Sequence, residues 1–530
     1  MSRRRSSVAT AEALGLTGST SYVCLAALFT HALLTVAFLV FINAASPFVI
    51  TSLPRRLPPD AIGSATSRLL LADELTALSL YLPVGALVDS AEWGLKRCAI
   101  AGYGIAAVAL VAYTRAPGLR WLIVARIVFA VGGSTLVTTM SALLLNMSAV
   151  PDPDSSRDTT TATSPPCADE QTETSRLLNN PRRGSTSSTV SAKSFSKSSR
   201  SAGILAFAGG TGAVIAVFGF LRLPTVLARF SPEADASSPA ALRFGLQTTF
   251  HLLAALAILQ AIFLACALPP SASSNPESRD GRPFKVAVRE VGNKLVEGFR
   301  LGAKDGNIAL GYASSFASRA QTTVTNAFLP LLIERYFSKY HLCDTPPDSL
   351  LPPRVDRDSC RRAYILASAL TGIVQLLSLV LSPLVGYLAS SPTTSRLTRH
   401  PHAALLGSAS LVGVVAFVGY STLPRDGDPR SGLTWVYASG VGVAQAAGVV
   451  LSLALVTTGR GRIVAADSAR RAEIAGTLSG AYGFSGGLGI LFVGASAGFL
   501  FDKWPGAPFA LMGVIDLLVA ISATVLYRRS

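Results

Sequence analysis

The chain alternates long apolar runs with polar stretches, and twelve of the apolar runs are long enough to cross a membrane. A transmembrane helix needs about 20 mainly apolar residues, because it must span about 30 Å of hydrocarbon. The expected spans are 21–50, 66–88, 97–115, 119–147, 202–221, 246–268, 307–333, 362–389, 403–421, 433–457, 472–500 and 507–527. The first run is too long for a cleaved signal peptide. The pattern predicts an all-α membrane protein with twelve transmembrane helices.

Two polar segments interrupt this pattern. Residues 148–201 are rich in Ser, Thr and Pro, so we expect a disordered cytosolic loop between the fourth and fifth spans. Residues 269–306 separate the sixth and seventh spans. There, the spacing of Val288, Val291 and Leu295 among basic residues suits a cationic amphipathic helix on the membrane surface. A simple solvated linker is the alternative interpretation of that segment.

The spans therefore divide into two groups of six. The expected organisation is a cytosolic N-terminal tail (1–20), an N-terminal six-helix bundle (21–268), a cytosolic linker (269–306), a C-terminal six-helix bundle (307–527) and a cytosolic tail (528–530). With Arg3, Arg4 and Arg5 in the cytosol, more of the loop Lys and Arg residues fall on the cytosolic side. This agrees with the positive-inside rule.

Composition narrows the class of protein. Of 530 residues, 50% are hydrophobic and only 14% are charged, whereas a soluble domain carries about 25% charged residues. This excludes an ordinary soluble enzyme, a disordered protein and a nucleic-acid binder, and it assigns the net charge of +16 to loops at a membrane surface. The sequence contains no nucleotide-binding loop and no serine-nucleophile or metal-binding motif, so we expect no enzyme activity, cofactor or metal.

The six cysteines are too few for a disulfide scaffold, and they show no zinc-type spacing. Cys343 and Cys360 both fall in the loop between the seventh and eighth spans, which the expected topology puts on the non-cytosolic side. Because disulfides persist in such compartments, we expect these two cysteines to form a bridge that closes the loop.

Two adjacent acids, Asp73 and Glu74, lie in the second expected span, near or just beyond the middle of the bilayer. Neighbouring side chains on a helix diverge by about 100°, so one of the two is expected to face a central cavity. An acid at this depth is a candidate for carrying a proton. In the alternative interpretation the helix starts later, and both acids lie at the water boundary near Ser67 and Arg68.

Two arginines lie inside spans, where a charge is costly and is usually retained for pairing or function. Arg126 lies about 10 Å from the outer end of the fourth span, so extension to the membrane surface is the alternative. Arg319 lies near the middle of the seventh span and is followed by Gln321, Thr322 and Asn326. Lipid cannot satisfy such groups, so we expect them to contact substrate in a central cavity or to make a purely structural contact with another helix. Alternatively, Arg319 pairs with an acid of the second span.

Other polar and small residues in the spans are expected to be structural. Single polar residues more often make interhelix hydrogen bonds than bind ligands. They are His31, His251, Gln375, Gln445 and Asp516. The eleventh span contains three pairs of glycines, each spaced four residues apart, which predict close backbone approach to another helix. The pairs are Gly476/Gly480, Gly483/Gly487 and Gly494/Gly498.

Two short motifs resemble signatures of the major facilitator superfamily. The loop after the second span contains Gly85, then Asp89 and Gly94 followed by basic residues, although Ser90 stands where a basic residue is usual. The fourth span contains Arg126 followed four and six residues later by small residues. Together with the two groups of six spans, the resemblance covers the whole chain apart from the long loop.

The resemblance implies two six-helix bundles with a substrate site between them near the midplane of the bilayer. It implies that Asp89, with Gly85, caps a neighbouring helix and holds one conformation closed. It also implies that Arg126 binds or relays a proton with an acid of the second span. The corresponding loop of the second half, after Gly386, lacks the acid. Fungal drug/proton antiporters are the members it resembles, although the fifth span lacks their Gly-Pro pair.

The long loop contains Glu173, three residues, and then Leu177 and Leu178. This spacing resembles the dileucine signal through which sorting adaptors direct membrane proteins to the vacuole or lysosome. An exposed cytosolic loop is where such a signal has to lie. We therefore favour a vacuolar or lysosomal membrane, with the plasma membrane as the alternative.

These observations predict a secondary transporter that moves a small organic solute across the bilayer by alternating access. Proton coupling and export or vacuolar sequestration are the favoured mode, with protons and the solute as partners. A facilitative or proton-symport uptake carrier is one alternative. A non-transporting receptor or scaffold with the same fold is another, although a scaffold has no evident use for Arg319 at mid-membrane.

Overall fold

The computed structural model describes residues 22–51, 62–90, 93–147, 186–231, 239–268, 293, 296–340, 361–391, 400–426, 428–466 and 474–529. These residues are helical apart from short turns, and none of them forms a strand. Helices satisfy their own backbone hydrogen bonds, which a segment surrounded by lipid must do. The expected all-α membrane fold is confirmed.

The N-terminal half contains six long helices. They are α2 (Tyr22–Thr51), α3 (Ile62–Val88), α4 (Gly94–Thr114), α5 (Leu119–Met147), α6 (Thr186–Phe218) and α8 (Pro239–Ala267). Three short helical segments join α6 to α8: η4 (Phe220–Arg222), α7 (Leu223–Leu227) and η5 (Ala228–Phe230). Helix α6 begins sixteen residues before the expected start of the fifth span at residue 202. Residues 186–201, expected to lie in a disordered loop, are therefore helical.

The C-terminal half begins with three consecutive helical segments and continues with five long helices. They are α10 (Gly306–Thr323), the π-helix η7 (Val324–Phe328), α11 (Leu329–Lys339), α12 (Arg361–Ser390), α14 (Pro401–Asp426), α15 (Gly432–Ala466), α16 (Ala475–Lys503) and α17 (Ala507–Arg529). Asp305 caps α10, because its side chain accepts hydrogen bonds from the backbone N–H groups of Asn307 and Ile308.

Among the described helices, eleven are long and apolar enough to cross a membrane. The remaining expected span, the seventh (307–333), corresponds to the continuous run α10–η7–α11. Its polar side chains, Arg319 and Gln321 among them, make α10 less apolar than the other spans. The π-helical turn then divides the run. Such turns are rare and often occur at functional sites.

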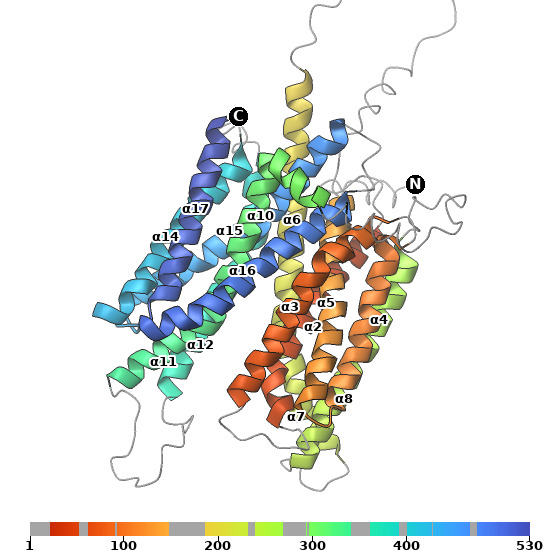
Figure 1. Ribbon diagram of the computed structural model, residues 1–530, viewed down its shortest axis with the longest axis vertical. Coiled ribbons are helices and arrows are strands. Elements are labelled where there is room, and N and C mark those ends of the chain that lie inside the picture. Colours follow the sequence, from red (N-terminus) through yellow and green to blue (C-terminus); the bar gives the residue numbers. More distant parts are fainter. Residues whose placement is uncertain are drawn as a thin grey trace, which may run out of the picture.

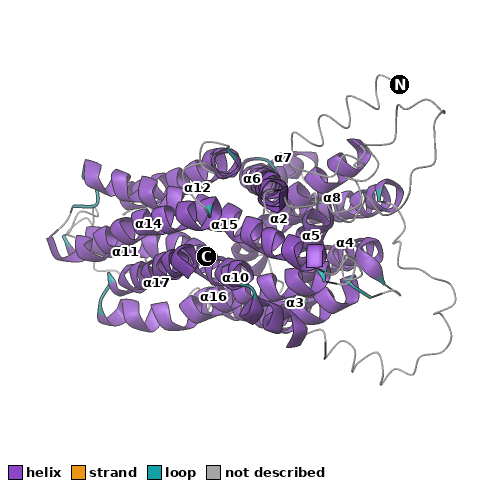
Figure 2. Cartoon of the chain, turned by 90° about the horizontal axis from the view of Figure 1, so that it is seen from above, coloured by secondary structure: helices purple, strands orange, loops and turns teal. Residues whose placement is uncertain are grey.

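The helices form two bundles that lie side by side (Figures 1 and 2). The bundles meet where α3 packs against α16 and where α6 packs against α12. Gly85 of α3 lies against Gly476 of α16, and Gly203 of α6 lies against Gly386 of α12, so closely that an added Cβ would collide with the facing backbone. We call this the joined end of the molecule: the end at which α3, α5 and α12 finish and α16 begins.

An apolar core continues from the N-terminal bundle through the joined end. Phe129 of α5 belongs to the same buried cluster as Tyr312 of α10 and Leu478 of α16. Further along α16 the contact ends, because a side chain added at Gly494 or Gly498 would meet no atom of the structure within 4 Å. Of the three glycine pairs, Gly476/Gly480 lies against the backbone of α3 as expected, Gly483/Gly487 lies against side chains of α3, and the third pair makes no such contact. Figure 1 shows the bundles diverging away from the joined end.

The described part of the linker packs on the second bundle. Residues 296–304 are helical. Phe299 lies edge-on to Phe484 of α16 with ring centroids 5.6 Å apart, and Tyr312 of α10 donates a hydrogen bond to the backbone oxygen of Gly298. The remainder of the expected amphipathic helix lies almost entirely outside the described residues.

Candidate functional site

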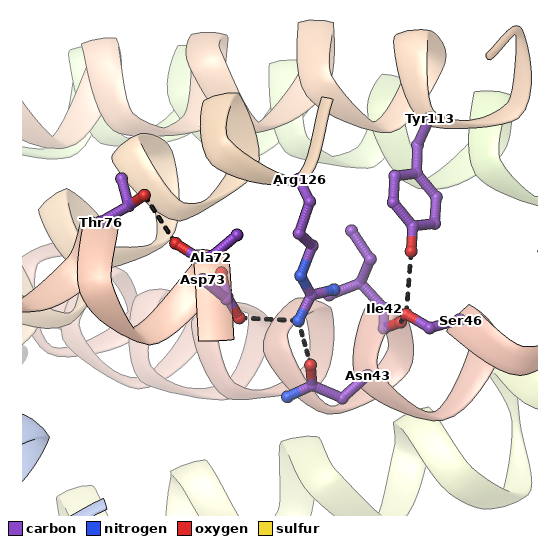
Figure 3. Close-up of polar contacts among 8 residues, drawn as sticks. All are labelled: Ile42, Asn43, Ser46, Ala72, Asp73, Thr76, Tyr113 and Arg126. Atoms are coloured by element: carbon purple, nitrogen blue, oxygen red, sulfur yellow. Dashed lines mark hydrogen bonds and ion pairs between the residues drawn. The ribbon is translucent and has the colours of Figure 1, made fainter. Parts of the chain in front are cut away.

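Asp73 of α3, Arg126 of α5 and Asn43 of α2 meet inside the N-terminal bundle (Figure 3). The Nη2 atom of Arg126 forms an ion pair with Oδ2 of Asp73 at 2.7 Å, and the same nitrogen donates a hydrogen bond to the side-chain oxygen of Asn43. Arg126 is 1% exposed and Asp73 is 9% exposed. Arg126 is thus held inside the bundle rather than extended to the membrane surface.

The surroundings of Arg126 leave part of its guanidinium unused. The group lies near the ring of Phe129, 5.7 Å from its centroid. Among the described residues, its Nε and Nη1 atoms have no hydrogen-bond partner. Nearby, the hydroxyl groups of Ser46 and Tyr113 form a hydrogen bond of 2.9 Å that links α2 to α4 (Figure 3). The cluster therefore has one neutralising acid and spare donors for a further acceptor group.

Glu74, the adjacent acid, has a different set of neighbours. Its carboxyl group interacts electrostatically with Arg319 of α10, in the other bundle, as well as with Asp73 and Arg126. Tyr81, two turns further along α3, interacts with both Glu74 and Arg319. Adjacent helix positions point about 100° apart. This explains why Asp73 pairs with Arg126 inside the N-terminal bundle, whereas Glu74 also interacts with Arg319 of the C-terminal bundle.

Helix α16 lies between these two charges, and its glycines make room on both sides. A Cβ added at Gly486 would come within 3.0 Å of Cγ of Arg319, and one added at Gly487 would come within 3.2 Å of the ring of Tyr81. The side chain of Arg319 is exposed, and the described residues form no direct ion pair between it and Glu74. The opposite charges of Glu74 and Arg319, one on each bundle, thus interact electrostatically without a direct bond.

The polar residues that follow Arg319 hold α10 and η7 to three other helices. Gln321 donates to Asp516 of α17 at 2.6 Å, Gln445 of α15 donates to Thr322 at 2.8 Å, and Gln375 of α12 donates to Asn326 at 3.1 Å. Gln321 is buried inside the second bundle, Thr322 is half-buried and Asn326 is exposed. Three of the four expected substrate-binding residues are therefore engaged in interhelix hydrogen bonds, and Arg319 is the fourth.

At the joined end, Asp89 caps the first turn of α16. Its Oδ1 accepts a hydrogen bond from the backbone N–H of Gly476 at 2.6 Å, and its Oδ2 accepts bonds from the backbone N–H and the hydroxyl of Thr477 at 2.5 and 2.7 Å. A carboxylate at a helix N-terminus satisfies free N–H groups and offsets the positive end of the helix dipole. Gly85, one turn earlier on α3, permits this close approach.

Two further contacts between the bundles were missed by sequence reasoning. Arg460 of α15 donates hydrogen bonds to the backbone oxygen of Leu145 and, at 2.9 Å, to the side chain of Asn146, both at the end of α5. Arg200 of α6 donates to the hydroxyl of Ser390 at the end of α12, at 2.7 Å. The expected spans ended at 457 and began at 202, so both arginines were assigned to loops.

Asn43 was also missed, although a lone amide in the apolar first span is a visible signal. The expected disulfide and sorting signal lie outside the described residues: Cys343, Cys360, Glu173, Leu177 and Leu178. Within the described ranges, no cluster of three or more His, Cys, Asp or Glu side chains is arranged to hold a metal ion.

Neither a known protein-family pattern nor a curated protein matches the sequence. Solved structures match its fold over 94% of the chain. They include the major facilitator superfamily proton:xylose symporter XylE bound to 6-bromo-6-deoxy-D-glucose (13% identity, 94% of that chain, TM-score 0.56), the human organic anion transporter MFSD10 (12%, 99%, 0.57) and the E. coli fucose:proton symporter FucP (14%, 98%, 0.56). At such identities the likeness shows the fold, which is that of major facilitator superfamily transporters.

Proposed function

We propose that this protein is a secondary transporter that moves a small organic solute by alternating access and couples that movement to protons. The observation that carries the proposal is the pair of opposite charges, Glu74 and Arg319, on the two bundles. They lie on helices that flank α16, near the level where its contact with the first bundle ends. In this fold, a solute site between the bundles alternates between the two sides of the membrane.

In this mechanism Glu74 carries the proton and Arg319 contacts the solute. Asp73 is already neutralised by Arg126, so Glu74 is the acid left to respond to the second bundle. When Glu74 is ionised, it offsets the charge of Arg319. When Glu74 binds a proton, the exposed guanidinium is left to attract an anionic or carbonyl group. Binding of the proton and of the solute are therefore linked.

The contacts at the joined end act as a gate in this proposal. Asp89 with Gly85 from the first bundle, and Arg460 from the second, bind helix ends of the opposite bundle. The distribution of Lys and Arg supports a cytosolic position for this end. The state described here is then closed to the cytosol, and release of these contacts opens it.

Export or vacuolar sequestration is supported by the resemblance to antiporters and by the dileucine-like sequence at Glu173, Leu177 and Leu178, which a sorting adaptor would read. This mode requires a solute that displaces the proton from Glu74 rather than one that binds together with it. Proton-coupled uptake is a second candidate, favoured by the exposed guanidinium of Arg319. An anionic solute held there binds best when Glu74 is protonated, so proton and solute travel together. The neighbours named as proton symporters and as an organic anion transporter support this candidate.

The test uses purified protein in liposomes that contain a pH-sensitive dye, with gradients imposed from a panel of sugars, organic anions and drugs. We expect one class of solute to drive proton movement. Its direction separates exchange from symport, because protons move against the solute in exchange and with it in symport. The Glu74→Gln variant should still bind solute but move no protons. The Arg319→Gln variant should lose solute binding.

Two outcomes would contradict the proposal. Equal solute flux without proton movement in the wild type and in Glu74→Gln would leave a facilitative carrier. No flux of any solute, with folding verified by thermal unfolding, would favour the receptor or scaffold interpretation.

A further inference from the structure

A second buried acid lies in the C-terminal bundle, away from Glu74 and Asp73. Asp516 of α17 is 1% exposed. Among the described residues it makes one hydrogen bond, in which Oδ1 accepts from Nε2 of Gln321 at 2.6 Å, and it makes no ion pair. Its Oδ2 atom and the Oε1 atom of Gln321 are both buried without a partner. Two buried acceptor oxygens in one hydrogen-bonded pair of side chains thus both lack a hydrogen-bond donor.

The helices around Asp516 supply no compensating charge. Helix α17 packs against α10, η7, α14 and α16. The charged and titratable side chains described on these helices and on α17 itself are Arg319, Tyr312, His402, Tyr420, Tyr482, Asp502, Lys503, Tyr527 and Arg528. None of them forms an ion pair or hydrogen bond with Asp516. On α14, Gly413 lies so close to Asp516 that an added Cβ would collide with Oδ2, so this oxygen lies against the backbone of α14, and that side is closed to a larger group.

We propose that Asp516 and Gln321 form a proton-binding site in the C-terminal bundle. An ionised carboxylate with a single amide partner inside a membrane span is strongly disfavoured. One proton on Oδ2 removes the charge and turns that oxygen into a donor toward Oε1 of Gln321. The acid and the amide are then joined by two hydrogen bonds, and both unpartnered oxygens are satisfied at once.

The site is connected to the proposed solute site through one helix. Gln321 lies two residues after Arg319 on α10 and three residues before the start of the π-helix η7. With the proton bound, two hydrogen bonds fix Gln321 to α17; without it, one remains beside a repelling charge. Loading of the proton therefore holds α10 in its present place. This last step rests on the proposed function of Arg319, whereas binding of the proton does not.

The test is infrared difference spectroscopy of the purified full-length protein at neutral pH, with no solute present. We expect the C=O stretching band of a protonated carboxylic acid in the wild type and in Glu74→Gln, and its loss in Asp516→Asn. The asparagine variant keeps both hydrogen bonds to Gln321, so it should fold. A band that is identical in the wild type and in Asp516→Asn would overturn the proposal.

A stability measurement provides an independent check. The folded state holds one more proton than the unfolded chain at this site, so the unfolding temperature of the wild type should fall as pH rises and the proton leaves. In Asp516→Asn that part of the pH dependence should be absent. Stabilisation of the wild type, but not of Asp516→Asn, by added Na⁺ or K⁺ at neutral pH would show that a metal cation occupies the site, and it would overturn the proposal. Neither measurement depends on transport.

Discussion

Arg126 illustrates how the burial of one charge dictates its neighbours. An arginine inside a membrane span must be paired, and here Asp73 and Asn43 converge on one of its nitrogens. Removing one partner of a buried ion pair typically costs about 3–5 kcal/mol, because the other charge remains buried alone. Replacing both partners with apolar residues often costs little. This difference allows structural and functional roles of the pair to be separated.

We therefore expect Asp73→Asn to lower the unfolding temperature markedly, and the double variant Asp73→Leu/Arg126→Met to recover most of the loss. If Arg126 binds or relays the proton, as the family resemblance implies, the double variant should remain unable to move protons. Thermal unfolding in detergent and the liposome assay measure the two properties. Asp73→Asn with the stability of the wild type would show that the pair contributes little to the fold.

At this scale the sequence identified the charged residues but not their partners. Arg126, Asp73, Glu74 and Arg319 stand out because each is a charge within an apolar run. Which acid pairs with which arginine depends on the packing of three helices, and no periodicity within one helix encodes it. The same limitation applies to Gln321, whose partner Asp516 lies 195 residues further along the chain.

At the scale of the element, some glycines of α16 lie in close contact with α3, whereas others further along the helix have no neighbouring helix against them. Gly480 faces the backbone of Tyr81 and the Cα of Gly85, whereas Gly498 has open space around it. An alanine in a helix is favoured over glycine by about 0.5–1 kcal/mol, because glycine loses more conformational freedom on folding. Of these two positions, only Gly480 has neighbouring atoms that an added Cβ would collide with.

The same substitution should therefore have opposite effects at the two positions. Gly498→Ala should raise the stability of the protein by up to about 1 kcal/mol, as expected for an unobstructed helix position. Gly480→Ala should lower it, because α3 and α16 must move apart. Thermal unfolding of the two variants, side by side, measures the sign. A stabilising Gly480→Ala would mean that the two helices are not in close contact.

Long apolar helices were predictable because their hydropathy is a local property, and eleven meet the requirements of a membrane span. The start of α6 and the end of α15 were not predictable, because polar residues extend both helices beyond their apolar segments. Thr186 begins α6 among serines, and Ala466 ends α15 after Arg460 and Arg462. The π-helix η7 was not predictable either, because no residue pattern in Val324–Phe328 marks it.

At the scale of the whole molecule, the joined end is held by reciprocal contacts. Asp89 of the first bundle caps the positive end of α16, and Arg460 of the second bundle binds the negative end of α5. Each charge sits at the helix end that favours it. The capping role of Asp89 could be anticipated from its motif, whereas that of Arg460 could not, since it depends on the length of α15.

Loss of the charge on Asp89 should weaken this closure. In a protein with spin labels at positions 93 and 461, one in each bundle near the joined end, Asp89→Asn should shift the distance distribution toward longer values. Trp93 is exposed, and a Cβ added at Gly461 would meet no other atom within 4 Å, so both positions accept a label. Double electron–electron resonance spectroscopy measures the distance between the two spin labels. Asp428→Asn is the matched control, because it removes a carboxylate from an exposed pair with Arg430 in the loop after α14. A distribution unchanged by Asp89→Asn would show that the charge does not hold the closure.

The apolar core shared by both bundles bears on the temperature dependence of turnover. Opening the joined end has to separate parts of one buried cluster, which contains Leu145 at the end of α5 as well as Leu478 and Tyr312 of the other bundle, and water then hydrates the separated surfaces. Hydration of apolar surface carries a positive heat capacity. Where opening limits the rate, the activation enthalpy of transport should increase with temperature, and an Eyring plot of flux should curve. A straight plot would mean that the rate-limiting step leaves this core dry. If the plot curves, the contacts that close the joined end also set how strongly the transport rate depends on temperature.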